Sequence, residues 1–295
     1  MQKTVTDVVS ITVFEKALPT LRPEIHRYCS RMMGSVIDGE DILQIAMMKA
    51  FEAIERGDEV ANLRGWLFRI AHNTALDVLR AKKREVTMHD TTKPLQPTYA
   101  EMPDRSEVVE SFRPFMALPP GQRSSVIFKD VFGYTTGEVA DLTDTTIASV
   151  KAALHRGRRA LRNFQDMPPE PSKPISSPEK QQLTMYAQLF NDRKFDDLRD
   201  LLSQEVRLEL VARTHLAGKD EVGSYFSNYA RVHDWLMMPG QVEGRPALLA
   251  FDQEDISSGP VYFVLLRFVA GKLEYIRDFR YARYVIAGAE WERLS

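Results

Sequence analysis

Basic residues are concentrated in one short stretch of a chain that is almost neutral overall. Residues 144–162 contain five Lys and Arg side chains against one acid, whereas the 295-residue chain has a net charge of -2. In a helix over this stretch, Val150, Leu154, Gly157 and Leu161 would form one stripe, with the basic side chains on other faces. Such a helix can attract phosphates. The pattern is typical of a DNA-reading helix or of a solvated amphipathic hairpin, and we favour the first.

A second group of polar residues recurs at helical spacing. Arg69, Asn73, Asp77, Arg80 and Arg84 follow one another at intervals of three or four residues, which places them on one face of a helix. An amide side chain can hydrogen-bond the edge of a base, and arginines can hold phosphates. This face therefore suits a separated DNA strand with an unstacked base.

Acidic residues gather at the start of another predicted helix. Asp38, Glu40 and Asp41 stand where the helix dipole favours negative charge, and apolar residues such as Met47 and Met48 follow them. Apolar surface beside charges is typical of a protein contact. A normally capped helix in a bundle has the same pattern, so these residues alone leave both interpretations open.

The elements that would position these residues are helical over the first half of the chain. Asn62 is expected to cap the helix of the second polar group, Thr135 and Glu138 form a capping box, and Thr146 caps the basic helix. A tight turn joins the last two, as in a helix-turn-helix. The periodicity predicts helices over 14–33, 39–56, 62–84, 108–117, 121–132 and two short segments on either side of 141–145.

Two proline-bearing segments interrupt this pattern, at 86–106 and at 166–178, and we expect both to be linkers. Beyond the second, apolar residues alternate in several short runs between Gly-containing turns. An α+β domain should therefore follow the all-α part. We predict its helices at 178–190, 195–202 and 219–231, and its strands at 206–212, 246–251, 261–268 and 273–284.

The overall composition excludes several classes of protein. Cys29 is the only cysteine, which excludes an internal disulfide, a cysteine zinc cluster and a two-cysteine redox motif. We find no signal-peptide block and no apolar run long enough for a membrane span. We therefore expect a cytoplasmic protein with no membrane contact, no cofactor and no metal site.

The helix-turn-helix region resembles domain 4 of the extracytoplasmic-function (ECF, group 4) sigma factors of the sigma-70 family. The resemblance rests on the runs LPPGQR, FGYTTGEVA and SVKAALHRGR, at residues 118–123, 132–140 and 149–158. It implies a domain that reads the minus-thirty-five promoter element. Two residues depart from the pattern: Ala153 replaces a basic or polar residue, and Gly157 replaces the usual Ala, which costs about 1 kcal/mol of helix propensity but allows a closer helix crossing. The implied DNA-facing residues are Thr146, Ser149, Lys151, His155, Arg156 and Arg158.

The preceding helices resemble domain 2 of the same family, through RYCSRMMGS, DGEDILQ and LRGWLFRIAHNTALDVLR, which begin at residues 27, 38 and 63. The resemblance implies docking on the clamp helices of core RNA polymerase through Asp38, Glu40, Asp41 and Gln44. Ile45 departs from it, since an acidic residue commonly follows the glutamine. The resemblance also implies reading of the minus-ten element, with Asn73 beside the pocket for a flipped base, by the face of Arg69, Asn73, Asp77, Arg80 and Arg84.

The C-terminal region resembles the SnoaL-like, nuclear-transport-factor-2-like cone, through YAQLFNDRKFDDL and VRLEL, which begin at residues 186 and 206. Such cones contain a pocket, for which the candidates here are Tyr186, Tyr262 and Tyr275, and a small apolar ligand would suit them. In ketosteroid-isomerase-like relatives a tyrosine acts with two carboxyl groups. Tyr186 matches that tyrosine, but Leu210 and Val264 occupy the carboxyl positions. We therefore expect no enzyme, unless another carboxylate or imidazole reaches the pocket, the candidates being His215, Asp252, Asp255 and Asp278.

These observations predict a multi-domain fold: two all-α sigma domains, a helical bundle and a helix-turn-helix, followed by an α+β cone-shaped SnoaL-like domain. We expect an alternative sigma factor that binds the clamp helices and flap of core polymerase and promoter DNA, with the C-terminal domain modulating it by intramolecular contact. The alternatives are a ligand-responsive helix-turn-helix regulator and a SnoaL-like cyclase or isomerase fused to a DNA-binding module. The expected boundaries are 10–85 for domain 2, 86–106 for a linker, 107–165 for domain 4, 166–178 for a second linker and 179–295 for the cone.

Overall fold

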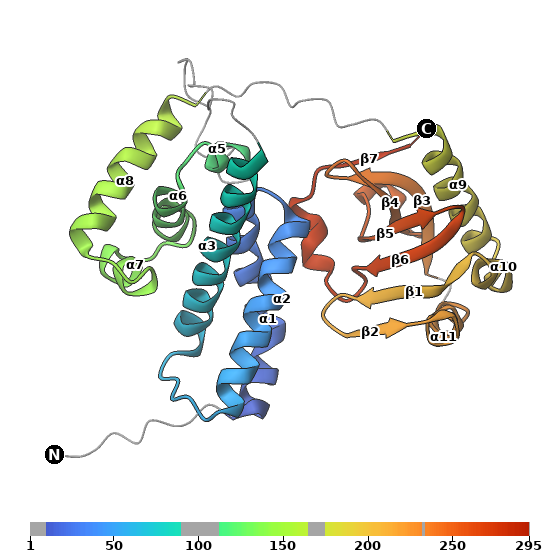
Figure 1. Ribbon diagram of the computed structural model, residues 1–295, viewed down its shortest axis with the longest axis horizontal. Helices are drawn as coiled ribbons and strands as arrows, with labels where there is room; N and C mark the ends of the chain where they lie inside the picture. The colour runs from blue at the N-terminus through green and yellow to red at the C-terminus, as the bar shows by residue number, and fades with distance from the viewer. Residues whose placement is uncertain (1–9, 90–111, 165–174, 232–233, 295) are drawn as a thin grey trace. The chain divides into compact units, whose positions relative to one another are not determined.

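The computed structural model describes residues 10–89, 112–164, 175–231 and 234–294 (Figure 1). The chain divides into two compact units, one ending at Pro168 and the other beginning at Pro169. No helix in the described ranges is long and apolar enough to cross a membrane.

All regular elements in the described residues of the first unit are helices. A bundle of three long helices precedes the short helices of the helix-turn-helix, and a π-helical turn follows α6 directly. The elements are α1 (Ile11–Met33), α2 (Val36–Glu55), α3 (Leu63–His89), α5 (Arg113–Met116), α6 (Pro120–Val126), η1 (Ile127–Val131), α7 (Thr136–Leu142) and α8 (Ile147–Arg162).

Capping residues start several of these helices where the sequence predicts. The Asn62 side chain accepts a hydrogen bond from the Gly65 amide at 3.0 Å, at the start of α3. Thr135 and Glu138 form the complete capping box of α7, and the Thr146 hydroxyl accepts from the Ser149 amide at 3.1 Å. These three expected caps are confirmed, and together they determine where both polar helix faces begin.

Two helical predictions differ from the structure. Helix α3 continues to His89, past the expected linker start at residue 86, because no proline stands before Pro94 to end it. The helix expected over 121–132 is α6 followed by the π-helical turn η1. The expected helix over 108–117 is described only from residue 112 onward, where α5 forms.

Helices α1 and α2 pack at very short range. A Cβ atom on Gly39 would lie 2.4 Å from the Ser30 Oγ and 2.7 Å from the Ser30 backbone, so only glycine fits at this crossing. On the same helix, Glu40 is fully buried and its carboxylate lies 2.6 Å from the Arg22 guanidinium. The start of α2 is therefore held against α1 by close packing and by a partly buried ion pair.

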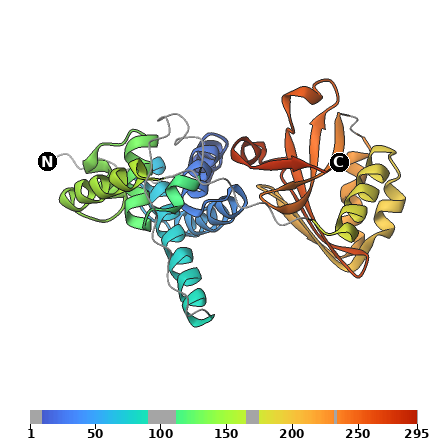
Figure 2. The same ribbon diagram turned by 90° about the horizontal axis from the view of Figure 1, so that it is seen from above.

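The second unit has one seven-stranded sheet with three helices on one side of it (Figures 1 and 2). The strand order is β2-β1-β6-β5-β4-β3-β7, in which β1 and β6 are parallel and the other pairs are antiparallel. The elements are α9 (Ser177–Asn191), α10 (Phe195–Asp200), β1 (Leu202–Leu210), β2 (Thr214–Ala217), α11 (Lys219–Tyr229), β3 (Trp235–Val242), β4 (Arg245–Asp252), β5 (Tyr262–Val269), β6 (Lys272–Asp278) and β7 (Trp291–Arg293).

An apolar core lies between the sheet and the helices α9, α10 and α11. Aromatic side chains dominate it, including Tyr186, Phe190, Phe226 and Tyr262. The α+β architecture expected for this region is confirmed, since helices cover one face of a curved sheet.

The boundaries of the second unit show three corrections. Helix α9 begins at Ser177, inside the expected linker 166–178, because Pro178 lies in its first turn, where proline is tolerated. Strands β2, β3 and β7 were not expected. The segment to residue 284, expected as one strand, ends as β6 at Asp278 and continues into a 3₁₀ helix at Arg283–Gly288.

Candidate nucleic-acid interface

The polar face of α3 is fully formed. The five residues predicted to share it are all exposed, while Leu67, Phe68, Ala71 and Ala75 on the opposite side are buried. This amphipathic division follows from the four-residue and three-residue spacing of both sets. The exposed set consists of Arg69, Asn73, Asp77, Arg80 and Arg84.

Two contacts orient this face. The Arg80 guanidinium lies 3.3 Å from the Asp77 carboxylate, one turn away on the same helix. The Arg69 guanidinium donates a hydrogen bond of 2.9 Å to the backbone carbonyl of Asp141 at the end of α7. Arg69 is thus hydrogen-bonded to the helix-turn-helix. The face as a whole offers guanidinium, amide and carboxylate groups to a polar ligand.

Helix α8 has a buried apolar side and a basic side, as predicted. Val150, Leu154 and Gly157 are buried, and a Cβ atom on Gly157 would lie 2.8 Å from the Val126 Cγ2 of α6. The glycine therefore allows the close crossing of α8 and α6 that the sequence predicted.

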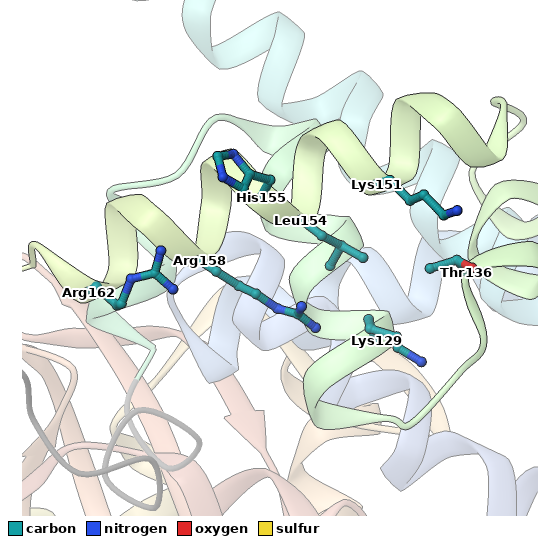
Figure 3. Close-up of a pocket in the computed structure, with 7 residues that line it drawn as sticks. All are labelled: Lys129, Thr136, Lys151, Leu154, His155, Arg158 and Arg162. Carbon is teal, nitrogen blue, oxygen red and sulfur yellow. The ribbon is translucent and has the colours of Figure 1, made fainter.

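Some of the basic side chains of α8 line a furrow of about 320 Å³ (Figure 3). Lys151, His155, Arg158 and Arg162 come from α8, and Lys129 faces them from η1. The Asp130 carboxylate accepts two hydrogen bonds from Arg158, at 2.9 and 2.5 Å, and this pairing raises the pKa of Arg158. The furrow therefore concentrates positive charge, and Asp130 holds one of its arginines in a defined position.

The six DNA-facing residues predicted for α8 do not form one patch. Lys151, His155 and Arg158 line the furrow, whereas Ser149 and Arg156 line a larger cleft of about 650 Å³ on the other flank of the helix. The Thr146 hydroxyl caps the helix and lies 2.9 Å from the Ser149 hydroxyl. The cleft is also lined by Arg80 and Lys83 of α3, together with His72, Ser124, Ser125, Thr143 and Thr145.

The four residues predicted to dock on polymerase separate into surface and interior. Asp41 is exposed, Gln44 is half-buried, and the half-buried Asp38 forms a 2.8 Å ion pair with Lys82. Glu40 is fully buried and paired with Arg22, so its side chain does not reach the surface and supports the fold. Its position on the stripe of Val36, Leu43 and Met47 is the signal that could have identified it as interior.

The same helix carries the apolar surface expected beside its acidic start, through Met48 as predicted and through Ile45 and Phe51, which were not named for it. Ile45, Met48 and Phe51 are exposed at intervals of three residues, and Met48 exposes 64% of its surface. Single exposed apolar residues are ordinary, but three at helical spacing next to Asp41 form a stripe. The stripe includes Ile45, which departs from the family pattern.

Two buried histidines lie in the first unit. The Tyr28 hydroxyl lies 2.7 Å from the His72 Nδ1, and the His26 Nε2 lies 2.9 Å from the Val36 carbonyl. Burial lowers the pKa of each histidine to about 4. Both are therefore neutral at pH 7, when the ring carries one proton that it can donate.

In the second unit, a buried carboxylate is hydrogen-bonded by two tyrosines that were not among the predicted pocket residues. Asp278 is completely buried and accepts hydrogen bonds of 2.8 Å from the Tyr225 hydroxyl, the Tyr229 hydroxyl and the Arg280 amide. The Tyr229 and Tyr262 hydroxyls lie 3.1 Å apart. Burial raises the pKa of Asp278.

Asp278 also pairs with Val264 across β5 and β6. It thus stands beside a predicted carboxyl position of the isomerase-like pattern, and among the four candidates named from the sequence it is the one that reaches the interior. Asp255 and His215 are exposed, and Asp252 is half-buried at the end of β4.

The three tyrosines proposed for a pocket are not brought together. Tyr186 and Tyr262 are buried in the core beneath the helices. Tyr275 is half-buried, and its hydroxyl donates a 2.6 Å hydrogen bond to Glu209, which pairs with Arg277. Because side chains alternate along β6, Tyr275 and Arg277 face away from the core that contains Ile276 and Asp278. Among the described residues, no group of three or more His, Cys, Asp or Glu could hold a metal ion.

Comparison with known proteins identifies two families within the first unit. The model of Sigma-70 region 2 matches residues 20–85, and the model of Sigma-70, region 4 matches residues 115–161. The first match contains the α3 face, and the second contains α7 and most of α8.

Two curated relatives come from Mycobacterium tuberculosis. ECF RNA polymerase sigma factor SigG is 30% identical over 221 residues, which cover 65% of this chain and 60% of SigG. ECF RNA polymerase sigma factor SigM is 31% identical over 142 residues, which cover 47% of this chain and 69% of SigM. The chain thus spans about 60% of the length of SigG.

Among solved structures, the extracytoplasmic function sigma factor SigJ of the same organism is 18% identical with a TM-score of 0.35, over 90% of this chain and 95% of SigJ. An NTF2-like protein of unknown function from Cytophaga hutchinsonii is 15% identical with a TM-score of 0.26, over 34% of this chain and 96% of that protein.

Proposed function

Because this chain belongs to the ECF RNA polymerase sigma factors, we propose that it directs core RNA polymerase to specific promoters and initiates DNA-templated transcription. The observation that carries the proposal is the exposed face of α3, on which all five residues with base-reading or phosphate-holding chemistry lie together. A helix-turn-helix repressor that never binds polymerase has no use for such a face in addition to a basic α8.

On the α3 face, Asn73 reads an unstacked base of the minus-ten element, and the arginines hold the flanking phosphates. An amide can pair with a base edge through two hydrogen bonds, whereas a guanidinium on an exposed helix face suits a phosphate. Asp77 orients Arg80 through their 3.3 Å ion pair. Strand separation would favour this contact, because the edge of a stacked, paired base is less accessible.

The minus-thirty-five element contacts the exposed side of α8, between the flank that lines the furrow and the flank that lines the larger cleft. Lys151, His155 and Arg158 contact one side of the groove, and Ser149 and Arg156 contact the other, while Thr146 determines the helix start. The separation of these residues on two flanks supports this arrangement, since a recognition helix in a major groove meets both of its walls.

Core polymerase docks on the start of α2. The proposed surface consists of Asp38, Asp41 and Gln44 with the apolar stripe of Ile45, Met48 and Phe51, and the buried Glu40 is excluded from it. Apolar side chains within a polar rim are the usual composition of a stable interface. By family resemblance, the clamp helices of polymerase bind here, and its flap binds the helix-turn-helix.

The second unit modulates this activity without catalysing a reaction. Leu210 and Val264 cannot transfer a proton, and the oxygens of the buried Asp278 already accept three hydrogen bonds within the protein. The second unit can regulate the sigma domains by contact. This requires only that it bind them with different affinity in two of their states. A small apolar ligand beside Tyr186 and Tyr262 would act through the same contact.

A selection experiment tests the proposed function against its strongest alternative. The full chain, a bacterial core polymerase and their mixture are each incubated with a random-sequence duplex library, and the bound DNA is sequenced. We expect the mixture to enrich a two-part site that neither component enriches alone. Enrichment of a palindromic site by the chain alone, unchanged when core is added, would instead favour the ligand-responsive regulator.

A further inference from the structure

We infer that the second unit binds a small organic carboxylate through a pair of arginines that lie beside its buried tyrosines. The site consists of Arg280 and Arg283, which follow β6 in the chain, and of the two rings on which their guanidinium groups lie, Tyr229 of α11 and Trp235 of β3. None of these residues belongs to the surfaces proposed for DNA or polymerase. The inference therefore goes beyond the proposed function and does not depend on it.

Aromatic rings hold both guanidinium groups in place. The Arg280 guanidinium lies 4.8 Å from the centroid of the Tyr229 ring, and the Arg283 guanidinium lies 4.9 Å from the centroid of the Trp235 ring. The Arg283 Nε also donates a hydrogen bond of 3.4 Å to the Arg280 carbonyl. A guanidinium has five N–H donors, so donors remain for an oxygen ligand when one side lies over a ring. Because the rings already restrict both side chains, less side-chain entropy is lost when an anion binds.

The two rings are connected through Tyr262. Its hydroxyl lies 3.1 Å from the Tyr229 hydroxyl, and its ring meets the Trp235 ring edge to face at 5.2 Å. Burial, followed by the charge of Asp278, raises the pKa of Tyr262, and the charges of the two arginines oppose this rise. Both guanidinium groups therefore lie close to the same phenol, so they can act together on one ligand.

The two arginines bring positive charge that no ion pair balances. Within the described part of the chain, neither Arg280 nor Arg283 forms an ion pair, whereas Arg277 pairs with Glu209 at 3.1 Å. Burial raises the pKa of Asp278, and the nearby charge of Arg280 lowers it. With Asp278 as a carboxylate, these three groups carry one net positive charge. One carboxylate balances that charge, whereas a phosphate dianion exceeds it.

The surface around the arginines favours an acid with an apolar body. Arginine binds a carboxylate through two parallel hydrogen bonds, and Arg283 is exposed while Arg280 is half-buried. Tyr281, between them in the chain, exposes 46% of its surface, and Trp235 is half-buried. The body of the ligand can lie on these rings while the arginines hold its carboxylate. A neutral apolar molecule has no group for the arginines and should bind more weakly.

The test titrates the full chain with benzoate and observes the tryptophan indole N–H groups by two-dimensional NMR. The chain contains three tryptophans, and the loss of one signal in Trp235→Phe identifies the signal of Trp235. The Trp235 indole N–H has no hydrogen-bond partner among the described residues, so its frequency responds to charge placed beside Arg283. Benzyl alcohol is the neutral probe of similar shape, and inorganic phosphate is an anion without an apolar body.

Arg280→Gln and Arg283→Gln each remove one cation and keep a polar side chain. Arg283→Lys keeps the charge but loses the paired donors of the guanidinium. Arg293→Gln is the matched control, because Arg293 is an exposed arginine over the Phe251 ring at 5.9 Å. Its strand β7 pairs with the end of β3 opposite to Trp235. Thermal unfolding identifies the variants that are folded, and Arg283→Lys provides the comparison if a Gln variant is not.

We expect benzoate to shift the Trp235 signal saturably and to bind about tenfold more weakly to Arg280→Gln and Arg283→Gln, since each variant loses a hydrogen bond to a charged group. Arg283→Lys should also bind benzoate more weakly, Arg293→Gln should match the wild type, and benzyl alcohol should bind more weakly than benzoate. The inference would be overturned by the absence of a saturable shift with benzoate, or by equal benzoate affinity in the wild type and the folded arginine variants. Tighter binding of phosphate than of benzoate would overturn the assignment to a carboxylate.

Discussion

At the scale of single residues, Asn73 makes the most specific contribution to the proposed promoter opening. It is the one amide among the guanidinium and carboxylate groups of the α3 face, and it is exposed. A base contact contributes to opening, whereas a phosphate contact contributes to every stage of binding. Residues that contact a base can therefore be distinguished experimentally from residues that contact a phosphate, by the stage of binding that their substitution affects.

Asn73→Ala should reduce strand opening more than it reduces initial binding, by about 1 to 3 kcal/mol for a lost base contact. Opening is measured with a fluorescent base analogue in the minus-ten element, and initial binding by mobility shift at low temperature. Arg84→Ala is the matched comparison on the same face, and it should weaken both stages and reduce the salt dependence of binding. Equal opening by Asn73→Ala and the wild type would contradict the assignment.

His72 should make the stability of the first unit depend on pH. Burial, followed by the charge of Arg80, lowers its pKa from 6.5 to about 4, so the folded unit disfavours the protonated ring. The stabilising contribution is complete above pH 6.5 and is lost as the pH falls towards 4. By pH 5 the free energy of unfolding should have decreased by about 2 kcal/mol because of this residue.

The variant His72→Gln isolates this effect, since an amide can still pair with the Tyr28 hydroxyl but does not titrate. Urea unfolding is compared at pH 7 and pH 5. The decrease should be smaller in the variant, and the remaining decrease should include the contribution of His26, whose pKa burial also lowers to about 4. An identical decrease in both proteins would show that His72 does not control it.

At the scale of elements, local signals predicted the helices well and the edge of the sheet poorly. The caps at Asn62, Thr135 and Thr146 depend on neighbouring residues alone, so they are readable in the sequence. Strand β3 contains Pro239 and Gly240, which argue against a strand. Its formation depends on pairing with β4 and β7, where a Cβ on Gly240 would lie 2.6 Å from the Leu249 Cδ1.

The residues of the candidate site also divide into those that a local sequence pattern predicts and those that it does not. Helical spacing was sufficient to predict the α3 face, because exposure there follows from periodicity. The pairing of Arg69 with Asp141, the position of Asp278 among tyrosines, and the outward orientation of Tyr275 all depend on residues distant in sequence. Tertiary contacts of this kind leave no local pattern, so a single sequence cannot predict them.

Helix α2 offers a matched test of surface against interior. Glu40→Ala should destabilise the first unit by about 3 to 5 kcal/mol, because it removes the buried carboxylate of an ion pair with the largely buried Arg22. Asp41→Lys should leave stability nearly unchanged and weaken binding to core polymerase. Thermal unfolding and a binding titration with core are measured for both variants. Weak binding by a fully stable Glu40→Ala protein would restore Glu40 to the docking surface.

At the scale of the whole molecule, the second unit should change the activity of the first. A chain ending at Asp166 retains every described element of the first unit and lacks the second. If the second unit contacts the sigma domains differently in their two states, its removal must shift promoter affinity. The two proteins are compared in transcription across salt concentrations, with and without small apolar ligands. Equal initiation under every condition would exclude a regulatory role.

The central claim is that this chain enables core polymerase to initiate at a specific promoter. Run-off transcription tests it most directly: core polymerase is supplied with the full chain, with the chain ending at Asp166 or with neither, on a template carrying the enriched two-part site. We predict one transcript of defined start position in the presence of at least one form of the chain, and its loss when either half of the site is scrambled. The absence of any chain-dependent transcript from both forms, although both bind core, would contradict the claim.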